Sequence, residues 1–236
     1  MKGIVHFHSE HSFDSISSID KILDHSMSLN LEFLILTDHD TVDGSIHLRQ
    51  RIKERNLPLI APIAAEYSTE DGDFISAFIN EEIKFSSTED LIGKTRAQDG
   101  IILLPHPFEG HSQKILNNVD KYCDLIETFN PRCSKEQNEL SEKLALKFGI
   151  STFQGCDAHL LTEMKNVISI SHPVANEEQL KNVLLESKFN CLTRDYTDKR
   201  LIYLSQMIKG LKTRNFRNIV KNLIKILVFS FKQKGT

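Results

Sequence analysis

Residues 3–14 read GIVHFHSEHSFD, and the interpretation of the whole chain starts from this stretch. Its first apolar residues predict a strand over Gly3–Phe7. On a strand, residues two apart project from the same face, so His6 and His8 would point the same way, with Phe7 on the other side. Two imidazoles placed in this way can hold one metal ion. Because a single His-x-His segment is weak evidence, matching positions are needed elsewhere in the chain.

The rest of the chain has the pattern of βα units. Short apolar runs alternate with segments of helical periodicity, which predicts an α/β fold, and seven or eight strands in one domain suggest a barrel. The expected strands cover residues 3–7, 32–36, 59–65, 74–79, 101–104, 124–129, 151–154 and 167–170. The expected helices cover residues 18–28, 43–55, 87–98, 134–148 and 176–185. Ser18 and Ser87 are the expected N-caps, and Gly149 is expected to end a helix.

The composition is that of an ordinary globular protein. The chain has 236 residues, of which 40% are hydrophobic and 26% charged, enough for one large α/β domain or two small ones. Its four cysteines occur singly, which favours a reducing, cytoplasmic setting over a zinc ribbon or a disulfide framework. The apolar run at the start is short and interrupted by two histidines, so we expect neither a signal peptide nor a membrane anchor there.

Charge is distributed unevenly along the chain. Residues 1–198 carry 19 basic and 32 acidic side chains, whereas residues 199–236 carry ten basic and no acidic ones. We therefore expect a barrel domain over residues 1–198 and a basic helical extension over residues 199–236. Residues 216–231 of this extension have the periodicity of an amphipathic helix. Its apolar face would be formed by Phe216, Val220, Leu223, Ile224, Leu227, Val228 and Phe231.

The basic helix has three open roles: packing on the acidic body, attachment to a membrane surface, and contact with another protein or a second copy. A nucleic acid substrate also stays open, although no basic and aromatic platform supports it. Because every candidate site residue named below precedes residue 160, we expect deletion of residues 212–236 to leave activity on a small substrate close to that of the full chain.

Histidines and carboxylates recur where the expected strands end, which is the rim on which (β/α) barrels build active sites. These residues are His6, His8, Asp38, His39, Glu66, His106, Glu127, Asp157 and His159. One such histidine is usually structural, but repetition at five strand ends argues against chance. Asp157 and His159 repeat the spacing of His6 and His8, so two strands offer facing pairs. Glu66 has two oxygens with which it could bridge two ions.

Other features narrow the chemistry. His106 ends a buried strand between Pro105 and Pro107, and this stiffness suits a ligand. The chain has no glycine-rich phosphate loop, no GxSxG segment and no Cys–His arrangement. Water on a metal ion is therefore the nucleophile that remains. A mixed set of imidazoles and carboxylates suits Zn, Mn or Fe(II) better than Ca or Mg.

Six segments resemble, in order and spacing, the PHP (polymerase and histidinol phosphatase) family over roughly residues 3–165. They read HFHSEHSFD, LTDHDTVDG, AAEYSTEDGD, LPHPF, IETFN and GCDAH. The resemblance implies a distorted (β/α)7 TIM-like barrel with two or three divalent metal ions that hydrolyse phosphoesters. It implies a first ion at His6, His8, Glu66 and Asp157, a second at Glu66 and His106, and a third at Asp14, His39 and His159. The implied catalytic residues are Glu66, Asp157 and His159.

The same resemblance implies roles for residues around the ligands. Asp38 would orient a ligand imidazole through its other N–H. Glu127 and Arg132 match an E-x-F-N-x-R-like element, and Arg132 would hold a phosphate with two hydrogen bonds. Where the family often has a histidine in an HILG-like run, this chain has Asp73, which we expect to replace it as a carboxylate ligand.

Two further histidines have weaker expectations. His11 is expected to hold no metal ion, because Asp14 matches the family's SFD element better. His111 follows a glycine in a loop and is a candidate for substrate contact.

Three functions follow from these features. The favoured one is a phosphatase or phosphodiesterase that attacks a small phosphorylated substrate with a metal-bound hydroxide. The alternatives are a metal-dependent amide or deacetylase-type hydrolase and a catalytically silent metal-binding module that regulates a partner. The nearly complete ligand set favours an enzyme over the silent module. The substrate depends on loop shapes around the rim, so the sequence predicts the reaction class and no more.

Overall fold

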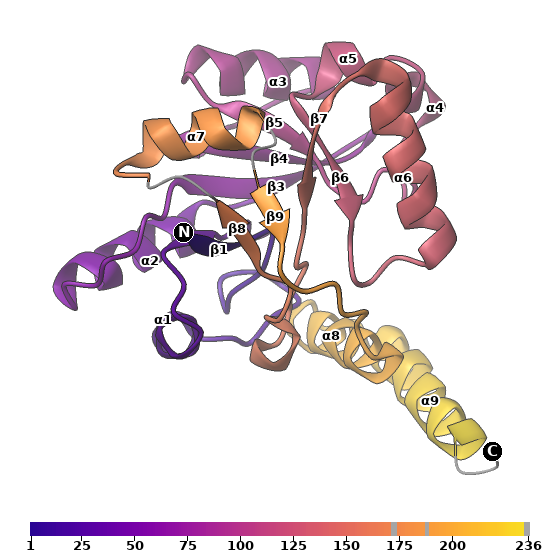
Figure 1. Cartoon of the computed structure of the whole chain (residues 1–236). Coiled ribbons are helices and arrows are strands. Elements are labelled where there is room, and N and C mark those ends of the chain that lie inside the picture. The colour runs from indigo at the N-terminus through magenta and orange to yellow at the C-terminus, as the bar shows by residue number, and fades with distance from the viewer. Residues whose placement is uncertain (171–173, 187–188, 234–236) are drawn as a thin grey trace.

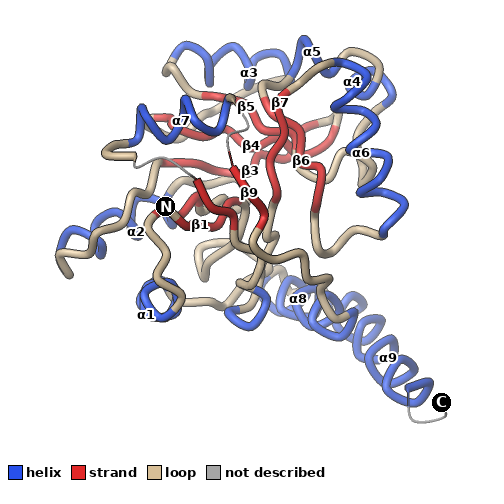
Figure 2. The backbone as a smooth tube through the Cα atoms, viewed as in Figure 1, coloured by secondary structure: helices blue, strands red, loops and turns tan. Residues whose placement is uncertain are grey.

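The computed structural model describes residues 1–170, 174–186 and 189–233, and of residues 230–233 it describes only the helical backbone. The strands lie at the centre and helices surround them (Figure 1, Figure 2). The α/β class predicted from the sequence is confirmed.

One of the two sheets has four strands in the order β2–β1–β8–β9. They are β2 (Phe33–Ile35), β1 (Lys2–Val5), β8 (Ile168–Ile170) and β9 (Phe189–Cys191). β1 pairs in parallel with β2, whereas β8 runs antiparallel to both β1 and β9. This sheet therefore joins the start of the chain to a segment more than 160 residues later.

The other sheet has five strands in the order β3–β4–β5–β6–β7. They are β3 (Ile63–Thr69), β4 (Gly72–Ile79), β5 (Ile101–Leu104), β6 (Leu125–Phe129) and β7 (Ser151–Gln154). The pairs β3–β4 and β4–β5 are antiparallel, and the pairs β5–β6 and β6–β7 are parallel. β3 and β4 form a hairpin whose turn ends at Gly72, where φ is +122°.

The (β/α)7 barrel is not what the described residues form, because neither sheet closes on itself. The physical reason is the β3–β4 hairpin, in which the chain reverses without a helix, so a parallel barrel cannot continue through β4. Single bridges instead join the sheets. They pair Phe7 with Ala158, Phe33 with Ile60, and His39 with Glu66.

Five helices occupy the places that the sequence predicted. They are α1 (Ile19–Ser28), α2 (Asp43–Glu54), α3 (Thr88–Ala97), α6 (Lys135–Phe148) and α7 (Glu177–Leu185). Ser87 caps α3 by accepting a hydrogen bond from the backbone N–H of Asp90, and Gly149 ends α6 in the left-handed region. Ser18 stands at the N-cap of α1, but its side chain makes no capping hydrogen bond.

The sequence did not predict four other short elements or the exact form of the tail. The elements are α4 (Gln113–Leu116), α5 (Val119–Tyr122), the 3₁₀ turn η1 (Leu161–Glu163) and β9. The tail forms two helices, α8 (Lys199–Lys212) and α9 (Phe216–Gln233).

Both sheets share one apolar core, to which strands β1 to β8 all contribute buried residues, among them Val5, Phe33, Ile75 and Phe153.

The tail helices differ in how they meet the body. α8 is fixed to it, because the Lys212 ammonium donates hydrogen bonds to the backbone carbonyls of Glu10, Ser12 and Ser15. α9 packs on α8 and extends beyond the body, with the C-terminus at its far end (Figure 1). Residues 199–212 therefore lie against the same N-terminal loop that carries His8 and its neighbours.

Candidate metal centre

The predicted histidines and carboxylates meet at the floor of one pocket. Its cavity volume is about 260 Å³. It is lined by Asp14, His39, Glu66, Asp73, His106, Glu109, Arg132, Asp157, His159, Ile202, Gln206 and Lys209. His6 and His8 lie beneath this lining and are 0% and 1% exposed. The polar side chains of the pocket thus come from six places in the fold: the strands β3 and β6, and the segments that follow β1, β2, β5 and β7.

The backbone turns sharply where it presents these side chains. His6, His106 and Asp157 have φ values of 62°, 29° and 44°, a region that residues other than glycine seldom adopt. β1 ends at Val5, so His6 and His8 do not lie on a regular strand as the sequence predicted. Their rings still meet, with centroids 5.5 Å apart. The sequence predicted that His6 and His8 would point the same way because they alternate on a strand. In the structure the turn at His6 and the bridge from Phe7 to Ala158 bring the two side chains together instead.

Three groups of side chains bring ligand atoms within 4.8 Å of one another. They are His6, His8 and Asp157; His6, Glu66 and His106; and His8, Asp14, His39 and His159. In the first group, Asp157 Oδ1 lies 3.7 Å from His6 Nε2 and 3.5 Å from His8 Nε2. Together with Glu66, these are the residues at which the family resemblance implied a first ion.

Glu66 lies between the groups. Its Oε1 is 3.0 Å from His106 Nε2, and its Oε2 is 3.3 Å from His6 Nε2 and 3.4 Å from His8 Nε2. The same Oε2 lies 3.6 Å from His39 Nδ1. The two oxygens therefore face different histidines, which is the geometry that a bridging carboxylate requires.

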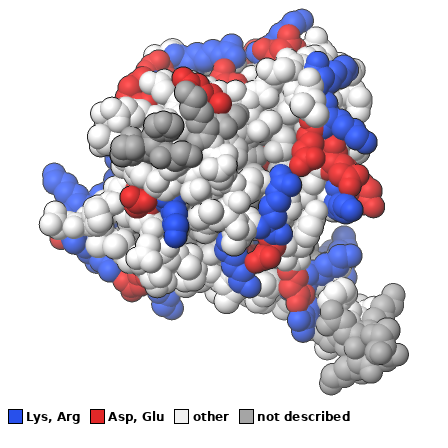
Figure 3. All heavy atoms as spheres, in the orientation of Figure 1, with Lys and Arg blue, Asp and Glu red and all other residues white. Residues whose placement is uncertain are grey.

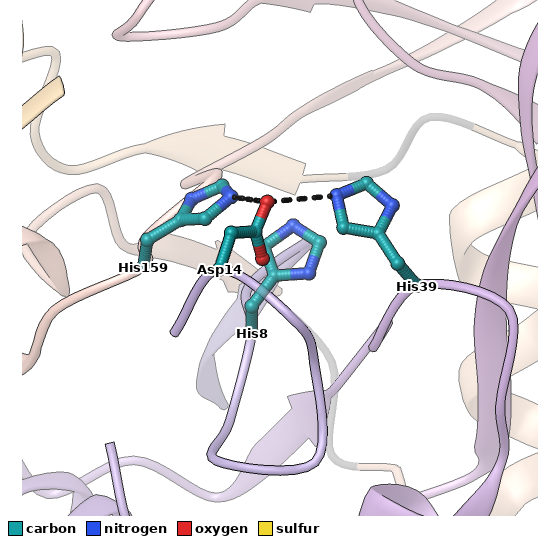
Figure 4. A group of neighbouring side chains, drawn as sticks. All are labelled: His8, Asp14, His39 and His159. Carbon is teal, nitrogen blue, oxygen red and sulfur yellow. Dashed lines mark hydrogen bonds and ion pairs between the residues drawn. The ribbon is translucent and has the colours of Figure 1, made fainter. Parts of the chain in front are cut away.

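In the third group Asp14 lies between two imidazoles (Figure 4). Asp14 Oδ2 is 3.1 Å from His159 Nε2 and 3.3 Å from His39 Nε2. His8 stacks on His39, with ring centroids 4.6 Å apart. The structure therefore adds His8 to the set that the resemblance implied for a third ion.

Glu127 lies behind the first two groups and fixes their orientation. Its Oε1 is 2.8 Å from His6 Nδ1, while its Oε2 accepts hydrogen bonds from the His106 backbone N–H and the Asn130 side chain. If His6 Nδ1–H donates to this carboxylate, the Nε2 lone pair faces the cluster. A Cβ atom on Gly155 would lie 1.5 Å from Glu127 Oε1, so only glycine fits in the GCDAH segment.

Asp38 supports the loop rather than an imidazole. Its two oxygens accept hydrogen bonds from the backbone N–H and the hydroxyl of Ser9, both at 2.6 Å. A Cβ atom on Gly44 would lie 1.8 Å from Asp38 Oδ2, which explains the glycine at the end of LTDHDTVDG. Asp38 thus fixes the turn that follows His8.

Arg132 is already held by protein groups. It donates hydrogen bonds to Glu163 Oε1 at 3.1 Å and to the Ser205 hydroxyl at 2.6 Å, and its Nη1 lies 3.0 Å from His159 Nδ1. Glu163 is 4% exposed and also accepts the backbone N–H groups of His159 and Leu160. Sequence reasoning missed Glu163, because it follows no expected strand and looks like any loop acid.

Three predicted residues lie at the margin or away from the groups. Asp73 lines the pocket but belongs to none of the three groups found among the described residues. His111 is half-buried and its Nε2–H donates to the Asp73 carbonyl at 2.7 Å, so it supports the β3–β4 hairpin. His11 contacts His47, with ring nitrogens 3.0 Å apart, and lies outside the three groups.

The tail helix α8 supplies a wall of the pocket that sequence reasoning missed. Ile202, Gln206 and Lys209 line the cavity beside the predicted ligands. The Lys209 ammonium lies 4.4 Å from the centroid of the Phe13 ring. A boundary drawn from charge alone could not show that the basic segment returns to the site.

The pKa values of the cluster reflect burial and close opposite charges. Burial lowers the pKa of His8 to about 3, and the neighbouring His159 acts in the same direction. Burial also opposes the charged form of His39 and His106, but adjacent carboxylates outweigh it and raise their pKa values to about 9 and about 10. Although burial favours the neutral acid, nearby histidines hold the pKa of Glu66 well below its ordinary value.

The cluster fits divalent metal ions on two independent grounds. Both ring nitrogens of His8, and Nδ1 of His39 and of His106, are buried without a hydrogen-bond partner in the described part of the chain. Asp14, Glu66 and Asp157 are at most 7% exposed, and buried anions need cations close by. Imidazole nitrogens and carboxylate oxygens at this spacing are ligands for Mn, Fe(II) or Zn.

The fold and the site together define an α/β protein with three groups of histidines and carboxylates that could hold metal ions. The PHP domain model matches residues 5–227, so the chain belongs to the PHP domain family. The family predicted from the sequence is confirmed, and the match continues beyond residue 198 into α9.

Sequence relatives occur in Methanocaldococcus jannaschii. The uncharacterized protein MJ1587 is 29% identical over 142 residues, which are 55% of this chain and 82% of that protein. The uncharacterized protein MJ0417 is 31% identical over 155 residues, which are 61% of this chain and 65% of that protein.

Solved structures share the fold at low sequence identity. A two-domain Bacteroides vulgatus protein containing a predicted PHP-like metal-dependent phosphoesterase has a TM-score of 0.69 and 12% identity, over 82% of this chain and 65% of that one. A Chromobacterium violaceum amidohydrolase with bound sulfate has a TM-score of 0.58 and 14% identity, over 80% and 97%. A proposed metal-dependent phosphoesterase of Bifidobacterium adolescentis has a TM-score of 0.56 and 14% identity, over 77% and 95%.

Proposed function

We propose that this protein hydrolyses phosphoesters with the help of two or three divalent metal ions, with Mn, Zn or Fe(II) as the fitting metals. The observation that carries the proposal is the set of three adjoining ligand groups beneath one pocket, with Glu66 facing more than one of them. Bound ions would acidify a water molecule and offset negative charge on a phosphoryl group.

The chain's own residues would orient and bind. Glu127 holds His6 so that one nitrogen faces the cluster, and Asp14 lies between His39 and His159, with which it would share an ion. Asp73, at the edge of the pocket, stays a proposed carboxylate ligand beside Glu66 and His106.

Lys209 and Arg132 give the pocket positive charge for an anionic substrate. Because Glu163 and Ser205 already hold Arg132, its guanidinium would act from a fixed position. Lys209 makes no hydrogen bond through its ammonium within the described residues and lies over the Phe13 ring, so it is free to bind a phosphoryl oxygen. The α8 wall thus favours a substrate small enough to enter a cavity of about 260 Å³.

The test is a panel of phosphate monoesters, phosphate diesters and N-acetylated amines, assayed on metal-free protein with Mn or Zn added back. We expect metal-dependent hydrolysis of a phosphoester, and its loss in Asp157→Asn. Hydrolysis of the amides alone would establish the amide hydrolase alternative. Tight metal binding with no hydrolysis across the panel would favour the silent regulatory module.

The four cysteines are free thiols, and three of them, Cys123, Cys133 and Cys156, are buried. This state fits a reducing compartment, so we propose action in the cytoplasm.

A further inference from the structure

The outer face of α9 is apolar and uncovered. Phe216 and Val220 are 73% and 56% exposed, and four more apolar residues of the same face are exposed to a similar degree. These are Leu223, Ile224, Leu227 and Val228, and with the first two they form the surface that we call the apolar stripe. Phe231, predicted to extend it, has a side chain outside the described part of the structure.

The opposite side of α9 explains why the stripe faces outward. Asn218 and Asn222 turn toward α8, and the Asn218 side chain donates a hydrogen bond to the Gln206 carbonyl at 2.8 Å. Asn222 is 3% exposed. The helix therefore packs on α8 through Asn218, Asn222 and the half-buried Ile219, while the apolar stripe faces solvent, which leaves α9 with a second apolar surface that no part of the described chain covers.

Basic side chains border the stripe. Arg217 and Lys221 stand beside Phe216, Val220 and Ile224 and line the same shallow hollow. No ion pair to either cation is found among the described side chains. Since residues 199–236 contain ten basic and no acidic residues, the whole segment carries one sign of charge.

We propose that α9 docks this protein on an anionic lipid surface. A helix that combines an apolar face with a basic border lies in the membrane interface, with its apolar side chains among the acyl chains and its cations among the head groups. No helix in the described ranges is long and apolar enough to span a membrane, so α9 lies on the surface rather than crossing it.

Charge favours this occupant over a second copy of the chain. Two α9 helices that covered each other's stripes would bring together two basic tails, with no acidic residue in either tail to offset the charge. Residues 1–198 carry more acidic than basic side chains and would be repelled by an anionic membrane, so the part that docks would be α9. In Figure 3 acidic and basic side chains are interspersed over the body, and α9 extends away from it.

Docking would also bring α8, the helix that lines the pocket, close to the membrane. α9 packs on α8, where Lys225 lies over the Tyr203 ring at 5.2 Å, and α8 lines the pocket with Gln206 and Lys209. The proposal itself does not depend on the reaction, because it concerns the helix alone.

The test is sedimentation of the full chain with vesicles of phosphatidylcholine alone and of phosphatidylcholine mixed with phosphatidylglycerol. We expect binding to the mixed vesicles only, weakened by salt. Arg217→Gln with Lys221→Gln should bind about 30-fold more weakly, since each cation near such a surface contributes a factor of about five. Val220→Ser with Ile224→Ser and Leu227→Ser should abolish binding.

Matched variants on α6 control for general changes of charge and apolar surface. Lys143→Gln with Lys147→Gln removes two exposed cations, and Leu140→Ser with Leu146→Ser removes exposed apolar side chains. Both should bind as the unchanged chain does, and circular dichroism should show that every variant is folded.

Three results would overturn the proposal. They are no vesicle binding by the full chain, equal binding to both vesicle types, and equal loss in the α6 and α9 variants. Light scattering provides a fourth check: a dimer that the α9 apolar variant dissociates, without vesicle binding, would assign the stripe to a second copy.

Discussion

We call the side chains of the three ligand groups the strand-end cluster. In this cluster Glu66 is 1% exposed and Asp14 2%, whereas on α9 Phe216 is 73% exposed and Val220 56%. One region buries charged groups and the other exposes apolar ones, so each reverses the common distribution of residues in a folded protein. Such a reversal is costly unless a ligand completes the surface. The two regions therefore indicate the two kinds of ligand that we propose, metal ions for the cluster and lipid for α9.

The regions differ in how firmly the fold supports them. Behind the cluster, Glu127, Asp38 and Glu163 hold ligand residues or their loops by hydrogen bonds with both oxygens. Behind α9, in the described part of the chain, the main packing partner is α8. The cluster is thus positioned before its ligand arrives, whereas the outward face of α9 depends on its ligand for cover.

Loss of Asp157 should have the largest effect on the cluster. Asp157→Asn removes an anionic oxygen that faces both His6 and His8. We expect bound metal to be lost and kcat/KM for a phosphoester to fall by at least ~10³-fold, equivalent to ~4 kcal/mol. Elemental analysis and initial rates measure the two effects. Asp120→Asn, on the exposed face of α5, is the control, and equal activity in both variants would contradict the role of Asp157.

The pH dependence of metal binding should be steep. In the metal-free protein the pKa values of His39 and His106 are raised to about 9 and about 10, so both rings carry a proton at neutral pH. The two rings belong to different ligand groups, so an ion at either group must displace one of these protons, and its affinity should therefore rise with pH by up to ~10-fold per unit until about pH 9. Metal titration calorimetry in buffers of different ionisation enthalpy would measure the released protons, and release of none at pH 7 would contradict this assignment.

Glu127→Gln should have a smaller effect than loss of a ligand. The amide would keep the shape but would lose the charge and turn one acceptor into a donor against the His6 and His106 donors. We expect metal affinity to fall by roughly 10–100-fold, with the ligands themselves intact. Glu139→Gln on the exposed side of α6 serves as the control. An unchanged metal affinity would show that Glu127 orients nothing.

Removal of α9 should have the smallest effect on hydrolysis. A chain ending at Asn215 keeps Lys209 in the pocket and the Lys212 anchor to the N-terminal loop. We expect its rate on a small phosphoester to stay within about twofold of the full chain, a change of under ~0.5 kcal/mol. The deletion of residues 212–236 predicted from the sequence to be neutral is a poorer test, because it removes Lys212. A large loss in the chain ending at Asn215 would mean that α9 supports the site.

Sequence patterns predicted the cluster well because its residues follow apolar strands at regular places. His6, His39, His106 and Asp157 each come directly after, or shortly after, a buried run of the sequence, and strand ends meet in an α/β fold. The helix limits were also close, since Ser87 and Gly149 act locally through caps. Local signals of this kind depend on neighbours in the chain and need no knowledge of the whole fold.

Long-range features could not be read in the same way. The prediction of a closed barrel was wrong because β4 pairs antiparallel with β3 through a hairpin. The apolar sequence of a strand does not show whether the strand pairs in parallel or antiparallel. The left-handed turns at His6 and Asp157 have no sequence signal, because glycine is absent there. The return of α8 to the pocket depends on contacts such as Lys212 with Ser15, which lie almost 200 residues apart.

The central claim is that the strand-end cluster is a multinuclear metal site, and anomalous diffraction from crystals loaded with Mn or Zn tests it most directly. The account predicts three ions, one in each group, in contact with Asp157, Glu66 and Asp14. If only two ions are bound, it predicts that Glu66 contacts both of them. The contradicting result is an empty cluster with the only anomalous peaks at surface histidines such as His11 and His47.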